Sequence, residues 1–311
     1  MQDDSALVEL FGNGEHLVLN GPGVSDTLFI PKDGLKGILD APVTTIYKSS
    51  AFQKGSTFLG KKYQQREISL AVYVRGETPE DWQDQDDRLR AMFDYDIDPW
   101  DPDSTLTKLS VTTSMSGKRS LWVALKESPT ADYSKDPHIV KNAVATFVLV
   151  APQPFWFEDK WEDAPFDYFE TGSSGTSEGF VTIANPTPLP MHLRWVVTRG
   201  KWTIPDYSWI GKKHQRVPGG EWANRKITLP LLTEVNGGAR ITVKRSEELM
   251  IRDFFNTNLA GQMNGIFFQH LVPPFTPETN LPVKVEEAPT GGSRIEVYCE
   301  HRWPRAWGNR A

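Results

Sequence analysis

The chain has 311 residues, 39% of them hydrophobic and 24% charged, which is the composition of a globular protein that is soluble in water. Its length allows two domains that can each bury a hydrophobic core. A membrane span is excluded because no apolar run approaches the roughly 18 residues that a spanning helix needs, and the acidic N-terminus lacks the pattern of a signal peptide. The single cysteine, Cys299, excludes an internal disulfide.

Charge is distributed unevenly along the chain. Residues 1–175 contain 17 Lys and Arg against 28 Asp and Glu, whereas residues 176–311 contain 17 against 12. Contacts to phosphate need cations, so the acidic first part argues against stable nucleic-acid binding. An acidic surface of this kind also avoids sticking to DNA that passes it.

The first elements in chain order are strands. Leu7–Phe11 and His16–Leu19 flank the turn Gly12-Asn-Gly14, which predicts an opening hairpin. Apolar side chains then alternate with other residues from Ile68 to Val74, the period of a half-buried strand, and Gly76 ends that strand.

A helix is predicted next, from Thr78 to about Asp94. Thr78 is placed to cap it, Pro79 suits its first position, and Asp81 completes a pattern like that of a capping box. Its apolar stripe and its ion pairs on the solvent side also follow from spacing. The stripe comprises Trp82, Leu89, Met92 and Phe93, and the pairs are Asp84 with Arg88 and Asp86 with Arg90.

A second hairpin is predicted after this helix, with strands at Leu106–Val111 and Leu121–Leu125. Alternation returns at Val144–Val150. One helix among several strands indicates a small α+β domain with a barrel-like or sandwich-like sheet, spanning residues 1–150.

Residues 151–175 follow as a joint and a short spacer. Seven of the 19 residues from Ala151 to Phe169 are aromatic, so this segment should pack against both neighbours and fix their angle, which a Gly/Ser linker would not do. Its central residues are Pro154, Phe155, Trp156 and Phe157.

Residues 176–311 are predicted to form a β-sandwich, because Gly and Pro punctuate seven short apolar runs at regular spacing. The stretch Ser246–Asn256 fits either a short helix or a turn. The predicted strands are Phe180–Ala184, His192–Thr198, Lys226–Pro230, Arg240–Lys244, Gly265–His270, Val283–Glu286 and Arg294–His301. The chain as a whole is therefore predicted to be mainly β.

Three segments carry a resemblance to a known family. The first is Arg-Glu-Ile-Ser-Leu-Ala-Val-Tyr-Val-Arg-Gly at 66–76 with the helix that follows it, and the second is Ala-Pro-Gln-Pro-Phe-Trp-Phe at 151–157. The third combines Leu-Val-Pro-Pro-Phe-Thr at 271–276 with Glu-His-Arg-Trp-Pro-Arg-Ala-Trp-Gly at 300–308. In this order they resemble the distal tail (Dit) proteins of phages with long non-contractile tails, most closely the Dit-like minor tail proteins of phages that infect actinobacteria.

The resemblance implies a structural virion protein at the distal end of the phage tail, made in the host cytoplasm. Its N-terminal domain would form a homo-oligomeric ring, a hexamer, around a channel for DNA, and its C-terminal domain would be a galectin-like β-sandwich. The implied partners are the tail tube protein, the tail hub or tail-associated protein, and other minor tail proteins.

An aromatic loop in the second half is the candidate contact surface. Trp202, Tyr207, Trp209 and Trp222 lie within 21 residues, among several basic side chains. The favoured interpretation is contact with a partner protein, where Trp, Tyr and Arg are enriched. The alternative function is a glycan-binding module for host attachment, with these rings stacked on sugars.

No enzyme, metal or cofactor motif stands out. Asp94, Asp96 and Asp98 have the spacing of a calcium loop, but Pro99 and Thr105 stand where such a loop needs Gly and Glu. The six histidines are scattered, and no nucleophile elbow is present. A tail enzyme that degrades peptidoglycan would need a carboxylate pair or a metal site, and neither is recognisable in the sequence. No cofactor is expected.

Overall fold

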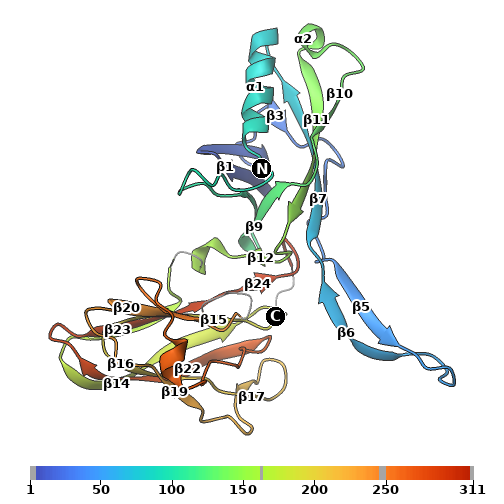
Figure 1. Ribbon diagram of the computed structural model, residues 1–311. Helices are drawn as coiled ribbons and strands as arrows, with labels where there is room; N and C mark the ends of the chain where they lie inside the picture. The colour runs from blue at the N-terminus through green and yellow to red at the C-terminus, as the bar shows by residue number, and fades with distance from the viewer. Residues whose placement is uncertain (1–4, 162–163, 245–249, 309–311) are drawn as a thin grey trace. The chain divides into compact units, whose positions relative to one another are not determined.

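The computed structural model describes residues 5–161, 164–244 and 250–308, and it separates into two compact units (Figure 1). Unit 1 comprises Met1–Phe157 and Pro304–Gly308, and unit 2 contains Glu158–Trp303. Both units are built mainly from antiparallel strands, which confirms the mainly β fold predicted from the sequence. Within the described residues, no helix is long and apolar enough to cross a membrane.

Unit 1 is organised around one antiparallel sheet with the neighbour order β2-β1-β8-β9-β11-β7-β3. The backbone N–H of Ile30, just after β3, donates to the carbonyl of Leu19 in β2 at 2.9 Å, so the two ends of the sheet meet and the sheet nearly closes into a barrel. The strands are β1 (Leu7–Gly12), β2 (Glu15–Asn20), β3 (Leu28–Phe29), β4 (Leu35–Lys36), β7 (Arg66–Arg75), β8 (Thr107–Thr113), β9 (Gly117–Leu125), β10 (Thr130–Asp132), β11 (Asn142–Ala151) and β12 (Trp156–Phe157).

Both predicted hairpins and the predicted long strand are present in this sheet. β1 pairs with β2, β8 pairs with β9, and β7 alternates buried and open side chains along most of its length. β11 pairs with β7 over ten residues and buries every second side chain. These strands form because their apolar residues recur with a period of two, so that one face can be buried.

The predicted helix is α1 (Pro79–Ala91), and a second short helix, α2 (Pro137–Val140), follows β10. Thr78 caps α1 by accepting from the N–H of Asp81 at 3.1 Å, while the Asp81 carboxylate accepts from the N–H of Glu77, one residue earlier than a capping box requires. Gly76 allows β7 to pass directly to α1, because a Cβ there would lie 2.2 Å from the backbone nitrogen of Trp82.

The apolar stripe of the helix is confirmed, and its ion pairs are confirmed only in part. Trp82, Leu89, Met92 and Phe93 are buried. Arg90 does pair with Asp86 at 2.6 Å, although Asp86 is buried and does not lie on the solvent side. The predicted partner of Arg88 is wrong, because Arg88 reaches Glu15 in β2 at 2.7 Å.

Residues 304–308 belong to unit 1, although the sequence analysis assigns them to the second domain. The buried guanidinium of Arg66 donates to the carbonyl of Pro304 at 2.7 Å, and Arg119 donates to the carbonyls of Arg305 and Gly308 at 3.0 Å each. Arg305 in turn forms a two-point ion pair with Asp40. Residues 304–308 are therefore held by buried arginines of the barrel, a non-local contact that short-range spacing does not indicate.

Unit 2 is a sandwich of two antiparallel sheets, as predicted. One sheet has the order β13-β23-β15-β20-β21 and the other β14-β22-β16-β19, with a large apolar core. The elements are η1 (Asp159–Trp161), β13 (Asp167–Thr171), β14 (Gly175–Asn185), β15 (Leu193–Thr198), β16 (Lys201–Pro205), β17 (Trp209–Ile210), β18 (Val217–Pro218), β19 (Lys226–Thr228), β20 (Gly238–Thr242), β21 (Ile251–Asp253), η2 (Ala260–Met263), β22 (Thr276–Ala288), β23 (Ser293–Cys299) and β24 (Arg302–Trp303).

Six of the seven predicted runs correspond to strands here, and the run Gly265–His270 does not. The N–H groups of Gln269 and His270 donate to the Asp206 carboxylate at 3.0 Å, so a side chain satisfies backbone groups that a strand would pair with a neighbour. Part of the ambiguous stretch, residues 246–249, lies outside the described residues, and β21 occupies 251–253.

Candidate functional site

A hairpin of unit 1 exposes a series of apolar side chains. Among the described strands, β5 (Val43–Lys48) and β6 (Thr57–Tyr63) pair only with each other (Figure 1). Every residue of β5 is exposed. At its tip Phe52 is 100% exposed. Further apolar side chains with about half or more of their surface in solvent follow along the hairpin, namely Val43, Ile46, Tyr47, Phe58 and Leu59. The sequence analysis did not predict this hairpin.

An acidic segment of the same unit complements the hairpin in charge. Residues 77–103 contain 11 Asp and Glu against two Arg, whereas residues 43–63 contain four Lys and no carboxylate. After α1 the acidic segment continues as an exposed loop, in which Trp100 is 91% exposed. Carboxylates of this loop accept from backbone N–H groups, Asp98 from Trp100 at 2.9 Å and Asp101 from Asp103 at 3.0 Å. In the described parts of the chain, no cluster of three or more His, Cys, Asp or Glu is arranged to hold a metal ion.

The residues expected to form the joint lie in unit 1. The carbonyl of Pro154 accepts from Arg66 at 2.9 Å, and Trp156 is fully buried. Phe157 stacks on Trp122, and Phe155 meets the ring of Tyr63 edge-on at 4.8 Å, at the base of the exposed hairpin. Within unit 1 these residues therefore contact both the barrel and the base of the hairpin. That they fix the angle between the domains remains a prediction.

The four aromatic residues predicted as one contact surface do not form one. Trp202 is fully buried in the core of the sandwich, and its indole N–H donates to the carbonyl of Thr198 at 2.9 Å. Trp202 is therefore a core residue, and its assignment to a surface for a partner or a glycan is wrong. Tyr207 and Trp209 pack against the same core while remaining partly open. Trp222 alone has about half of its surface (49%) in solvent.

A buried carboxylate holds this region together. Asp206 forms an ion pair with Arg225 at 2.7 Å and accepts from the backbone N–H groups of Gln269 and His270. Arg225 also donates to the carbonyl of Phe267, and its guanidinium faces the ring of Trp222. Asp206 therefore fixes the aromatic loop to the chain segment before β22, a role that sequence spacing does not reveal.

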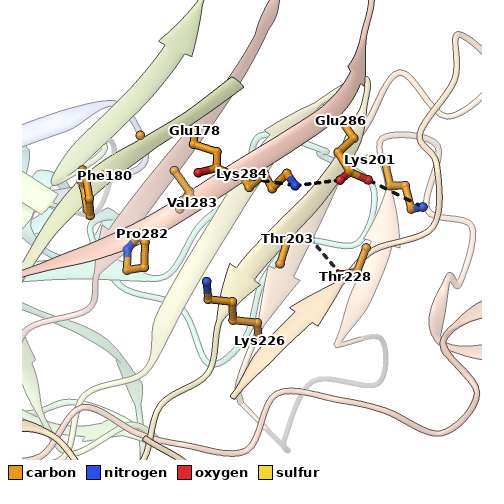
Figure 2. Close-up of a pocket in the computed structure, with 11 residues that line it drawn as sticks. Glu178, Phe180, Lys201, Thr203, Lys226, Thr228, Pro282, Val283, Lys284 and Glu286 are labelled. Carbon is orange, nitrogen blue, oxygen red and sulfur yellow. Dashed lines mark hydrogen bonds and ion pairs between the residues drawn. The ribbon is translucent and has the colours of Figure 1, made fainter. Parts of the chain in front are cut away.

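The outer face of the sheet β14-β22-β16-β19 contains a pocket of about 490 Å³. Figure 2 shows Lys284 between Glu178 and Glu286, with Lys226 extending between Pro282 and Thr203. Lys284 lies 2.9 Å from Glu286 and 3.6 Å from Glu178. The hydrogen bond from Lys284 lowers the pKa of the Glu286 carboxyl, so both partners are charged at neutral pH.

Comparisons with known proteins support the resemblance read from the sequence. The chain is 24% identical over 348 aligned positions to the minor tail protein Gp27 of Mycobacterium phage D29 and 23% identical to that of Mycobacterium phage L5, covering 97% of this chain and 98% of each relative. No family model matches. The solved structure of the Dit protein (gp 19.1) of phage SPP1 matches with a TM-score of 0.52 at 13% identity, covering 94% of this chain and 98% of that one.

The fold is thus that of a distal tail protein, and the full-length relatives are minor tail proteins. Together they bear out the predicted resemblance to the Dit-like minor tail proteins of actinobacterial phages, and the predicted location in the tail of the virion. The chain is a component of a phage tail.

Proposed function

We propose that this chain forms a closed ring of six copies at the tail tip, which joins the tail tube to the hub and host-recognition proteins and keeps a channel open for DNA. The role is structural and not catalytic. The likeness to tail proteins supports the location, and the exposed hairpin is the observation that carries the proposed self-association.

The hairpin β5–β6 needs a partner to be stable. A two-stranded hairpin without further packing is marginal in water, and its large apolar side chains lie open to solvent. Exposed apolar patches of this kind mark surfaces that another protein covers. The edge contact between Tyr63 and Phe155 anchors only the base of the hairpin.

A second copy of the same chain supplies the matching surface. The four lysines of the hairpin, Lys48, Lys54, Lys61 and Lys62, face no acid within 43–63, while residues 77–103 of each copy present a strongly acidic surface. Opposite charges steer association and fix register between such surfaces. The two surfaces are different parts of one chain, so the contact is head-to-tail, and contacts of this type form a ring when the rotation from copy to copy closes.

Charge reversal tests this contact. Lys61→Glu with Lys62→Glu should abolish ring formation, because like charges would then face each other. Adding Asp96→Lys and Asp103→Lys to the same chain should restore rings, because the hairpin would then carry the negative charges and the segment 77–103 the added positive ones. Analytical ultracentrifugation of each variant provides the measurement.

The matched control is Lys32→Glu with Lys36→Glu, which makes the same change in net charge on exposed lysines of unit 1 outside the hairpin. The control should assemble as the parent chain does. Equal loss of assembly in the control and the hairpin variant, or no rescue by the exchanged charges, would contradict the proposed contact.

A further inference from the structure

The pocket on the outer face of the sheet β14-β22-β16-β19 has no role in the proposed ring. Its lining comes from all four strands, whose solvent-facing side chains lie next to one another in register. Its volume of about 490 Å³ falls in the range of sites for small organic ligands. None of the four aromatic residues singled out from the sequence lines it.

One side of the pocket is apolar and the other carries hydroxyl groups. Phe180 is 64% exposed and lies opposite Pro282 across the paired strands β14 and β22. The Thr203 and Thr228 hydroxyls are 2.9 Å apart on β16 and β19. A flat ring on one side and hydroxyl groups on the other match the two kinds of group on a sugar, which has C–H groups to stack and hydroxyls to hydrogen-bond.

The charges of the pocket leave one cation uncompensated. Lys284 and Lys201 both reach Glu286, at 2.9 and 3.9 Å, and Lys284 also lies near Glu178. Among the described residues, Lys226 has no carboxylate within 4.0 Å, and it extends into the pocket (Figure 2). A negative group of a ligand would therefore find its ion pair at the Lys226 ammonium.

We propose that this pocket binds a carboxylated sugar, with the sugar ring stacked on Phe180 and its carboxylate paired with Lys226. A peptide is a poorer match, because extended peptides gain affinity from main-chain bonds at a sheet edge. The groups offered here are side chains on the face of the sheet. This inference is independent of ring formation, since every residue that carries it lies in unit 2.

Calorimetric titration of the full chain tests the proposal. The probes are a tetrasaccharide of alternating glucuronic acid and N-acetylglucosamine, the uncharged N-acetylglucosamine tetramer, and tetraglutamate. The acidic tetrasaccharide should bind, and the other two should bind at least about tenfold more weakly, because each lacks either the carboxylates or the sugar rings.

Two substitutions assign the binding to the pocket. Lys226→Gln should weaken binding of the acidic tetrasaccharide about tenfold, and Phe180→Ser about threefold or more. Lys212→Gln, at an exposed lysine outside the pocket, is the matched control and should leave affinity unchanged. Circular dichroism checks that each variant is folded.

Three results would overturn the proposal. The first is no binding of the acidic tetrasaccharide to the parent chain. The second is binding that Lys226→Gln and Phe180→Ser leave unchanged. The third is equal binding of tetraglutamate, which would make the face a surface for acidic peptides. A change in oligomeric state would be seen separately by ultracentrifugation, so failure here leaves the ring proposal standing.

Discussion

Replacing Arg66 with Met is expected to lower the free energy of unfolding by about 3 kcal/mol or more. The Arg66 guanidinium is buried and donates to four backbone carbonyls at 2.6 to 2.9 Å, those of Gly37, Leu39, Pro154 and Pro304. Burial lowers its pKa to about 10, which leaves it charged at neutral pH. Met fills much of the same space but donates no hydrogen bond, so the carbonyls would lose their partner.

Urea denaturation of the full chain measures this loss, and hydrogen exchange assigns it to unit 1. Residues 304–308 should lose protection first, since Arg66 holds Pro304 directly. The control is Arg75→Met at the exposed end of the same strand β7, where little change is expected. An Arg66→Met chain that is as stable as the control would show that the carbonyls find other partners.

Replacing Asp206 with Ala should destabilise unit 2 by about 3 to 5 kcal/mol. The Asp206 side chain is 2% exposed, and that of its partner Arg225 is 15% exposed. Without the carboxylate, the Arg225 charge and the N–H groups of Gln269 and His270 would be buried without their acceptor. Removing one member of a buried pair costs more than the pair itself contributes.

Thermal unfolding with tryptophan fluorescence checks this expectation, because Trp209 and Trp222 belong to the loop that Asp206 holds. Glu234→Ala, at an exposed acid of the same unit, is the control and should shift the midpoint little. A midpoint for Asp206→Ala that equals the control would show that the loop is held by its apolar contacts alone.

Local patterns in the sequence predicted the parts of the fold that depend on near neighbours. The period-two strands, the hairpin at Gly12–Gly14 and the cap at Thr78 follow from spacing and from residue preferences. The stripe of α1 follows in the same way. Each of these features needs only contacts within one element or across one turn.

The features that were missed depend on contacts between distant residues. Trp202 has aromatic neighbours in sequence, yet its position in β16 turns it into the core. Arg66 and Pro304 are separated by 238 positions, and Asp206 and His270 by 64. The hairpin β5–β6 has no buried face, so its sequence lacks the alternation that marks a half-buried strand.

The Figure 2 pocket is another product of tertiary structure. Its residues come from strands that are far apart in the sequence, and only the register of the sheet brings Phe180, Lys226 and Lys284 to one face. Each residue taken alone resembles ordinary polar or apolar surface. A cation without a nearby carboxylate can be recognised only when its neighbours in space are known.

Native mass spectrometry of the purified full chain, with negative-stain images of the same sample, tests the proposed ring most directly. Particles of six copies with an open centre are the predicted result, and Lys61→Glu with Lys62→Glu should convert them to single chains. A parent chain that stays monomeric at every concentration, or that associates equally well with the hairpin charges reversed, would contradict the account.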